Sequence, residues 1–243
     1  GNKIFDRDVN SNRVAWLTLS SNKADHLRYN GVGRVGNCSG ALLDTSVSEG
    51  APAYFLTAAH CLDYQGGYFP SQGVFTDILV SSSVVQFNYY MDVVSADQIL
   101  SESVKKITFA TMENNDLAIL ELSSSLEDLK NKGLKAYKIS SKAPHKGQLV
   151  KLVGVPLSGV TSLGLRKAVC RIGKQVFLEE GDFSFPQSYR HRCSSVGGVS
   201  GSPLFDFDSL EIIAVNNTGV NDNSQGQGPC TLNRPCEVKP NGE

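Results

Sequence analysis

The sequence predicts an all-β fold. Short segments with strand composition recur along its 243 residues, and turn-forming residues, mainly Gly, Asn, Asp and Ser, bound them. Long segments with helical periodicity are few between them. Many short strands at close intervals are typical of β-barrels and β-sandwiches, and periodicity does not distinguish the two. The expected strands are 14–19, 38–43, 54–57, 78–87, 116–122, 149–155 and 210–215.

A polar segment at 123–147 interrupts the apolar runs and is the best candidate for a boundary between two units. Ser, Lys, Glu and Asp dominate it. Ser125 with Asp128 three residues later can cap a helix N-terminus, and Gly133 after Lys132 can end the helix. We therefore expect one short helix of about two turns in the linker.

Composition excludes several classes of protein. The chain has 23 basic and 24 acidic residues and a formal net charge of −1, without a block of like charges. Neither nucleic acid nor an anionic membrane is therefore expected as a partner, and no apolar run approaches the length of a membrane span. Six cysteines without a Cys-x-x-Cys pair favour disulfides and a secreted or otherwise extracytoplasmic protein. The chain opens without a charged-then-apolar leader. We therefore expect it to be a mature or trimmed form of a longer precursor, which would be a zymogen.

Three stretches carry residues suited to nucleophilic catalysis. Ser200 lies in Gly197-Gly198-Val199-Ser200-Gly201-Ser202-Pro203, where the glycines permit a sharp turn that presents a hydroxyl. Because serine is a weak nucleophile at its ordinary pKa, it needs a base and an orienting acid. His60 in Thr57-Ala58-Ala59-His60-Cys61 and Asp116 in Asn114-Asn115-Asp116-Leu117 are the candidates.

The order His, Asp, Ser in these stretches resembles the trypsin/chymotrypsin-like serine endopeptidases. Within that family the sequence is most similar to the bacterial branch that includes glutamyl and lysyl endopeptidases. The supporting segments are Cys38-Ser39-Gly40-Ala41-Leu42-Leu43, Tyr54-Phe55-Leu56 before the histidine motif, Gly154-Val155-Pro156, and Cys193 to Pro203. Together they span residues 38–205.

The resemblance implies two six-stranded antiparallel β-barrels with the active site in the cleft between them. Residues 1–125 would form the first barrel, with His60 and Asp116, and residues 126–243 the second, with the Ser200 loop and the specificity pocket. The implied activity is that of a secreted serine endopeptidase that cleaves peptide bonds through an acyl-enzyme intermediate. The N–H groups of Gly198 and Ser200 would form the oxyanion hole. We expect a monomer acting on protein or peptide substrates, without a cofactor.

The family pattern also implies a disulfide between Cys38 and Cys61. We further expect Cys170–Cys193, which would brace the wall before the serine loop, with Cys230–Cys236 as the remaining, local pair.

Pocket residues transfer from the family one position at a time. Ser194 falls at the pocket floor with Ser195 beside it, and Asn216 and Gly219 fall on the walls. The floor has no carboxylate to pair with Arg or Lys, and glutamyl endopeptidases have a histidine where Asn216 stands. We therefore expect cleavage after uncharged residues of medium or large size, although Asp206, Asp208 or Asp222 in a remodelled loop would change this.

One departure from the digestive enzymes concerns activation. They have an aspartate immediately before the serine, which pairs with the new N-terminal ammonium, whereas this chain has Val199. The oxyanion loop must therefore be shaped by something other than an inserted N-terminus.

Other schemes fit the sequence less well. An α/β-hydrolase needs its acid and histidine after the serine, and no histidine follows Ser200. A cysteine peptidase is disfavoured because each cysteine has a plausible disulfide partner, and His26, His145 and His191 are expected to be ordinary core or surface residues. Calcium ligands from Asp206, Asp208, Asp222 or Glu237 lack a recognisable spacing, so no metal is expected. The remaining alternative is a protease-fold binding protein without catalysis.

Overall fold

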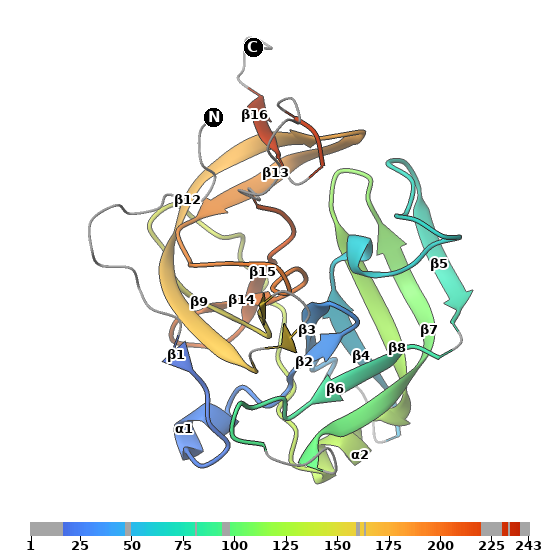
Figure 1. Cartoon of the computed structure of the whole chain (residues 1–243), viewed down its shortest axis with the longest axis vertical. Helices are drawn as coiled ribbons and strands as arrows, with labels where there is room; N and C mark the ends of the chain where they lie inside the picture. The colour runs from blue at the N-terminus through green and yellow to red at the C-terminus, as the bar shows by residue number, and fades with distance from the viewer. Residues whose placement is uncertain are drawn as a thin grey trace.

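The computed structural model describes residues 17–46, 50–80, 82–93, 98–158, 161–162, 164–219, 230–232 and 234–238. They form two β-structures that lie side by side (Figure 1). The first is a closed barrel in which the strands follow the order β7-β6-β2-β3-β4-β8 and β7 pairs with β8. A further strand, β5, pairs with β7. The bounds are β2 Val32–Val35, β3 Cys38–Leu42, β4 Pro52–Thr57, β5 Val74–Leu79, β6 Val84–Phe87, β7 Leu100–Thr111 and β8 Leu117–Ser125.

The second structure is a curved antiparallel sheet of order β1-β12-β9-β14-β15, with β13 and β16 also paired to β12. β10 and β11 form a separate hairpin. Within the described residues, β13 and β15 are not paired to each other. The bounds are β1 Leu17–Thr18, β9 Leu149–Gly154, β10 Leu157–Ser158, β11 Thr161–Ser162, β12 Arg166–Glu180, β13 Phe183–His191, β14 Pro203–Asp206, β15 Ile212–Val215 and β16 Cys236–Val238.

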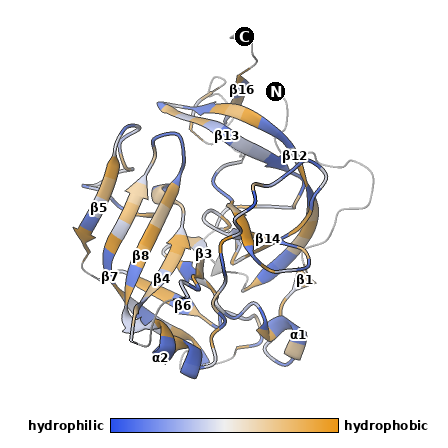
Figure 2. Ribbon diagram, turned by 180° about the vertical axis from the view of Figure 1, so that it is seen from behind, coloured by the Kyte–Doolittle hydropathy of each residue, from blue (hydrophilic) through white to orange (hydrophobic). Residues whose placement is uncertain are grey.

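The prediction of an all-β protein is confirmed. Apolar and polar side chains alternate along the strands, which gives the banded ribbons of Figure 2. β3 departs from this alternation because all five of its residues are buried. It lies where the barrel meets the second sheet, so both of its faces are covered. The predicted boundary at residue 125 stays a prediction, and β1 from the first half of the chain pairs with β12 from the second.

Buried side chains join the two structures. One apolar cluster combines Val32, Ala41 and Leu56 of the barrel with Val153 and Phe205 of the second sheet. Another fills the barrel and extends to the β12–β13 hairpin through residues that include Leu178 and Phe185. The hairpin therefore packs against the barrel, over which it arches in Figure 1.

The prediction of one continuous strand at 78–87 is wrong. β5 and β6 both run antiparallel to β7, but the pairing breaks between Leu79, opposite Lys106, and Val84, opposite Ser103. Between these two pairs, the segment that joins β5 to β6 contains more residues than the facing part of β7. Ser82 has a φ of 67°, a conformation that interrupts a regular strand.

The predicted helix in the linker is confirmed as α2, Leu126–Asn131. The Ser125 hydroxyl accepts from the Asp128 N–H at 3.0 Å, and the Asp128 carboxylate accepts from the Ser125 N–H, which completes a capping box. Gly133 has a φ of 86°, as expected after a helix C-terminus. The other α-helix of the described residues is α1, Ala24–Leu27. No helix in these ranges is both long and apolar enough to cross a membrane.

Replacing Ser125 with alanine removes the cap and should lower the free energy of unfolding by about 1 kcal/mol. Denaturant titration measures this loss. Ser123→Ala, an exposed neighbour in β8, is the matched control and should change stability by a few tenths of that amount. Equal stabilities for the two variants would contradict the capping role.

Candidate active site

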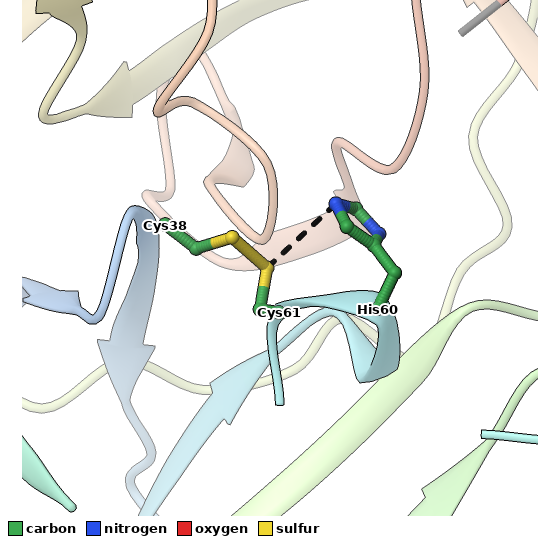
Figure 3. A group of neighbouring side chains, drawn as sticks. All are labelled: Cys38, His60 and Cys61. Carbon is green, nitrogen blue, oxygen red and sulfur yellow. Dashed lines mark hydrogen bonds between the residues drawn. A yellow bond between two sulfur atoms is a disulfide. The ribbon is translucent and has the colours of Figure 1, made fainter. Parts of the chain in front are cut away.

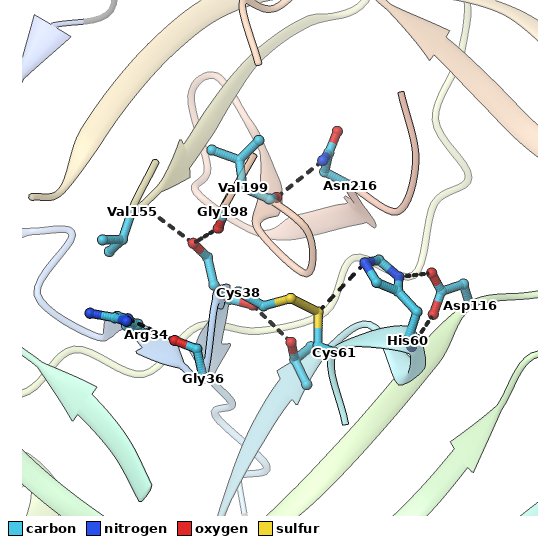
Figure 4. Close-up of a disulfide and its surroundings, with 12 residues drawn as sticks. Arg34, Gly36, Cys38, His60, Cys61, Asp116, Val155, Gly198, Val199 and Asn216 are labelled. Carbon is cyan, nitrogen blue, oxygen red and sulfur yellow. Dashed lines mark hydrogen bonds and ion pairs between the residues drawn. A yellow bond between two sulfur atoms is a disulfide. The ribbon is translucent and has the colours of Figure 1, made fainter. Parts of the chain in front are cut away.

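The barrel brings His60 and Asp116 together. β4 ends at Thr57 and leads into a short 3-10 helix, η1 (Ala59–Cys61), that carries His60, while Asp116 lies just before β8. Because Thr57 pairs with Ala118, both side chains emerge at the same end of adjacent strands. The His60 N–H donates to Asp116 Oδ1 at 3.0 Å, and Nδ1 of the ring hydrogen-bonds Asp116 Oδ2 (Figure 4).

This contact influences the protonation of the imidazole. Burial by itself lowers the pKa of His60, but the hydrogen bond and negative charge of Asp116 outweigh it, and the charge of Glu180 adds to them. The pKa of His60 is therefore raised above its ordinary value. Since Nδ1 is held by the carboxylate, Nε2 is the ring nitrogen available for proton transfer.

Ser200 lies in the loop between β13 and β14, beside the segment that carries His60. Its carbonyl accepts from the Ser39 N–H at 2.8 Å. The next residue, Gly201, has a φ of 77°, and a Cβ there would lie 2.2 Å from the Ser39 carbonyl oxygen and 2.3 Å from Thr57 Oγ1. Only glycine permits this close approach of the serine loop to the end of β4.

The structure does not close a hydrogen bond between His60 and Ser200. His60 Nε2 instead lies 3.8 Å from Cys61 Sγ (Figure 3). That sulfur is bonded to Cys38, so the group Cys38, His60 and Cys61 has no thiolate to offer a metal. The same holds for Cys170, His191 and Cys193. Catalytic hydrogen bonds are often unformed without substrate.

Two backbone N–H groups of the serine loop are available as hydrogen-bond donors. Within the described part of the chain, the N–H groups of Gly198 and Ser200 donate to no acceptor. Gly198 has a φ of 93°, and a Cβ there would meet the Val155 carbonyl oxygen at 2.7 Å. The loop conformation therefore depends on glycine at this position.

Comparison with family models identifies the family of this chain. The model of the trypsin-like peptidase domain matches residues 38–215, which is most of the chain. The chain belongs to the trypsin-like peptidase domain family. A comparison with curated protein sequences gave no match.

Similar solved structures confirm the chymotrypsin-like fold. Human heparin binding protein is 15% identical, with a TM-score of 0.53, over 86% of this chain and 83% of that one. A mutant of human heparin binding protein is 13% identical, with a TM-score of 0.52, over 80% and 82%. At this identity the similarity establishes the fold alone.

All three predicted disulfides are present in the structure. They join Cys38 to Cys61, Cys170 to Cys193, and Cys230 to Cys236. The first ties β3 to the residue after His60. The second ties β12 to the segment before the serine loop.

A groove of 390 Å³ begins beside Asp116 and runs between β13 and β15. Of the predicted pocket residues, Asn216 lines it, whereas Ser194, Ser195 and Gly219 lie outside it and are half-buried. Asp116 is the only carboxylate among the described lining residues, and no lysine or arginine lines it. Its walls include Leu178, Phe185, Ile213, Val215, Asn217 and Thr218.

Several residues near the site carried no recognisable signal in the sequence. Glu180, at the end of β12, is buried and contributes its charge to His60. Tyr68 packs edge-on against the His60 ring at 6.3 Å between centroids and against Phe183 at 6.5 Å. These contacts depend on the β12–β13 hairpin crossing to the barrel, which pattern analysis of one sequence does not predict.

Glu180→Gln should lower the pKa of His60, because the imidazolium loses part of its electrostatic stabilisation. The acid limb of any activity that needs neutral His60 then moves to lower pH. Asp182→Asn, two residues away and exposed, is the control and should leave the titration unchanged. NMR titration of the His60 ring protons measures both, and an unchanged or raised pKa in Glu180→Gln would contradict the assignment.

Proposed function

We propose that this protein is a serine endopeptidase. Ser200 Oγ attacks the peptide carbonyl while His60 Nε2 takes the hydroxyl proton, and the C–N bond breaks as His60 returns that proton to the leaving amine. Water then hydrolyses the acyl-enzyme by the same route. The N–H groups of Gly198 and Ser200 stabilise the oxyanion in both halves of the reaction.

The observation that carries this proposal is the pairing of His60 with Asp116 in a trypsin-like peptidase domain. The carboxylate fixes the ring tautomer and raises the pKa of the imidazole, as a general base beside a serine requires. Ser200 on the adjacent loop and two unengaged amides beside it support the remaining roles. The missing contact between Ser200 and His60 would form on substrate binding.

The lining of the groove supports the prediction that the substrate presents uncharged side chains there. Its apolar walls and the lack of a lysine, arginine or second carboxylate among the described lining residues favour apolar or amide groups over charged ones. Cleavage after uncharged residues of medium or large size therefore stays our prediction, as does membership of the glutamyl and lysyl endopeptidase branch. The three disulfides support a secreted protein.

A fluorophosphonate probe tests the proposal without knowledge of the substrate, because it labels only an activated serine. The wild-type protein should be labelled at Ser200, as mapped by mass spectrometry, and Ser200→Ala should not be labelled. His60→Ala should slow hydrolysis on the order of a million-fold, and Asp116→Asn on the order of ten thousand-fold. His145→Ala, an exposed histidine, is the control and should retain full activity.

Thermal melts of each variant must show a folded protein. A folded wild type that is neither labelled nor hydrolyses any member of a diverse peptide library would overturn the proposal in favour of the non-catalytic binding protein. Hydrolysis that persists in Ser200→Ala would overturn the assignment of the nucleophile.

A further inference from the structure

The loop that presents Ser200 keeps its shape through hydrogen bonds to its carbonyl groups. In a trans peptide unit, the C=O of one residue and the N–H of the next point in opposite directions. Fixing a carbonyl therefore fixes the direction of the following N–H. The Gly197 carbonyl accepts from the Leu157 N–H at 2.8 Å, which turns the Gly198 N–H away from Leu157.

Asn216 does the same for the amide of Ser200. Its Nδ2 donates to the Val199 carbonyl at 3.0 Å, and that carbonyl also accepts from the Ser202 N–H at 3.1 Å. The Asn216 side chain is itself oriented by His191, whose Nε2 lies 2.9 Å from Asn216 Oδ1. Since Nδ2 is the donor to Val199, Oδ1 must be the acceptor, and His191 Nε2 carries the proton. Burial lowers the pKa of His191, which keeps it neutral.

Ser39, on β3 of the barrel, fixes the peptide unit that joins Gly198 to Val199. This unit lies between the two peptide units described above. Its Oγ donates to the Gly198 carbonyl at 2.8 Å and accepts from the Val155 N–H at 2.8 Å (Figure 4 shows the Gly198, Val155 and Asn216 contacts). The Ser39 side chain is fully buried. Four consecutive carbonyls, from Gly197 to Ser200, thus have donors outside the loop turn.

We propose that Ser39 and Asn216 are positioning residues that hold the oxyanion amides of Gly198 and Ser200 ready for catalysis. Their hydrogen bonds take the place of an ion pair at position 199, which Val199 cannot form because it has no charged group. Both are neutral donors, so the loop does not depend on the protonation of an α-amino group. This inference rests on the proposed function.

Ser39→Ala and Asn216→Ala test it. Each should lower kcat about ten- to hundred-fold with KM within about three-fold of wild type, because loss of an oxyanion donor costs a hundred- to thousand-fold and these residues act through the donor. Affinity for a peptidyl boronate, which forms a tetrahedral adduct, should fall in parallel, and affinity for a cleaved peptide product should not.

Matched controls separate positioning from stability. Thr111 Oγ1 also donates to a glycine carbonyl, that of Gly73 at 2.8 Å, and accepts from a backbone N–H. Asn30 likewise bridges two backbone groups, with Nδ2 donating to Gly133 O at 2.8 Å. Thr111→Val and Asn30→Ala should lose stability without loss of kcat or of boronate affinity.

Suppose that the wild type is labelled and active, and that Ser39→Ala and Asn216→Ala match their controls in kcat and boronate affinity. That result would overturn this inference and leave the proposed function standing. A wild type that is not labelled would instead remove the proposed function. Should either alanine variant fail to fold, the wild-type pH profile decides. We expect no loss of activity centred near the α-amino pKa of about 8, and such a loss, abolished by acetylation of the α-amino group, would overturn the inference.

Discussion

The buried residue Ser39 is the junction on which the relative placement of the two β-structures at the site depends. Its N–H, Oγ and carbonyl together bond Ser200, Gly198, Val155 and Thr57, at 2.8 Å in each case. Three of these partners belong to the second half of the chain and one to the end of β4. A buried polar group without a partner costs free energy comparable to a lost hydrogen bond. A shift of either half would break several of these bonds at once, so the junction resists movement.

Placement of the candidate catalytic groups follows from this junction. His60 and Asp116 are fixed within the barrel by the pairing of β4 with β8, and the Cys38–Cys61 disulfide ties the residue before Ser39 to the residue after His60. Ser200 comes from the other half. Its distance to His60 is therefore set by packing between the halves, which the shared apolar cluster maintains. Under the proposed function, such a division lets one half position the base while the other positions the nucleophile and oxyanion donors.

Local signals in the sequence predicted the all-β class and the helix α2, because caps and turns are short-range. The disulfide pairs were expected from the resemblance to the family, which implied Cys38–Cys61 first. The long strands β7, β12 and β13 were not predicted. In β7, charged residues such as Lys105 and Lys106 interrupt the apolar pattern, since part of one face of the strand is exposed. The contacts of Ser39, Glu180 and Asn216 join residues far apart in the chain, and one sequence alone does not reveal them.

The most direct test of these roles is a crystal structure of the protein after reaction with a peptidyl boronate. We expect a covalent bond from Ser200 Oγ to boron, one boronate oxygen about 3 Å from the N–H groups of Gly198 and Ser200, and His60 Nε2 turned from Cys61 toward the adduct. The Gly197 to Ser200 backbone should keep the bonds that it has here. An adduct on another residue, or a boronate oxygen remote from both amides, would contradict these roles.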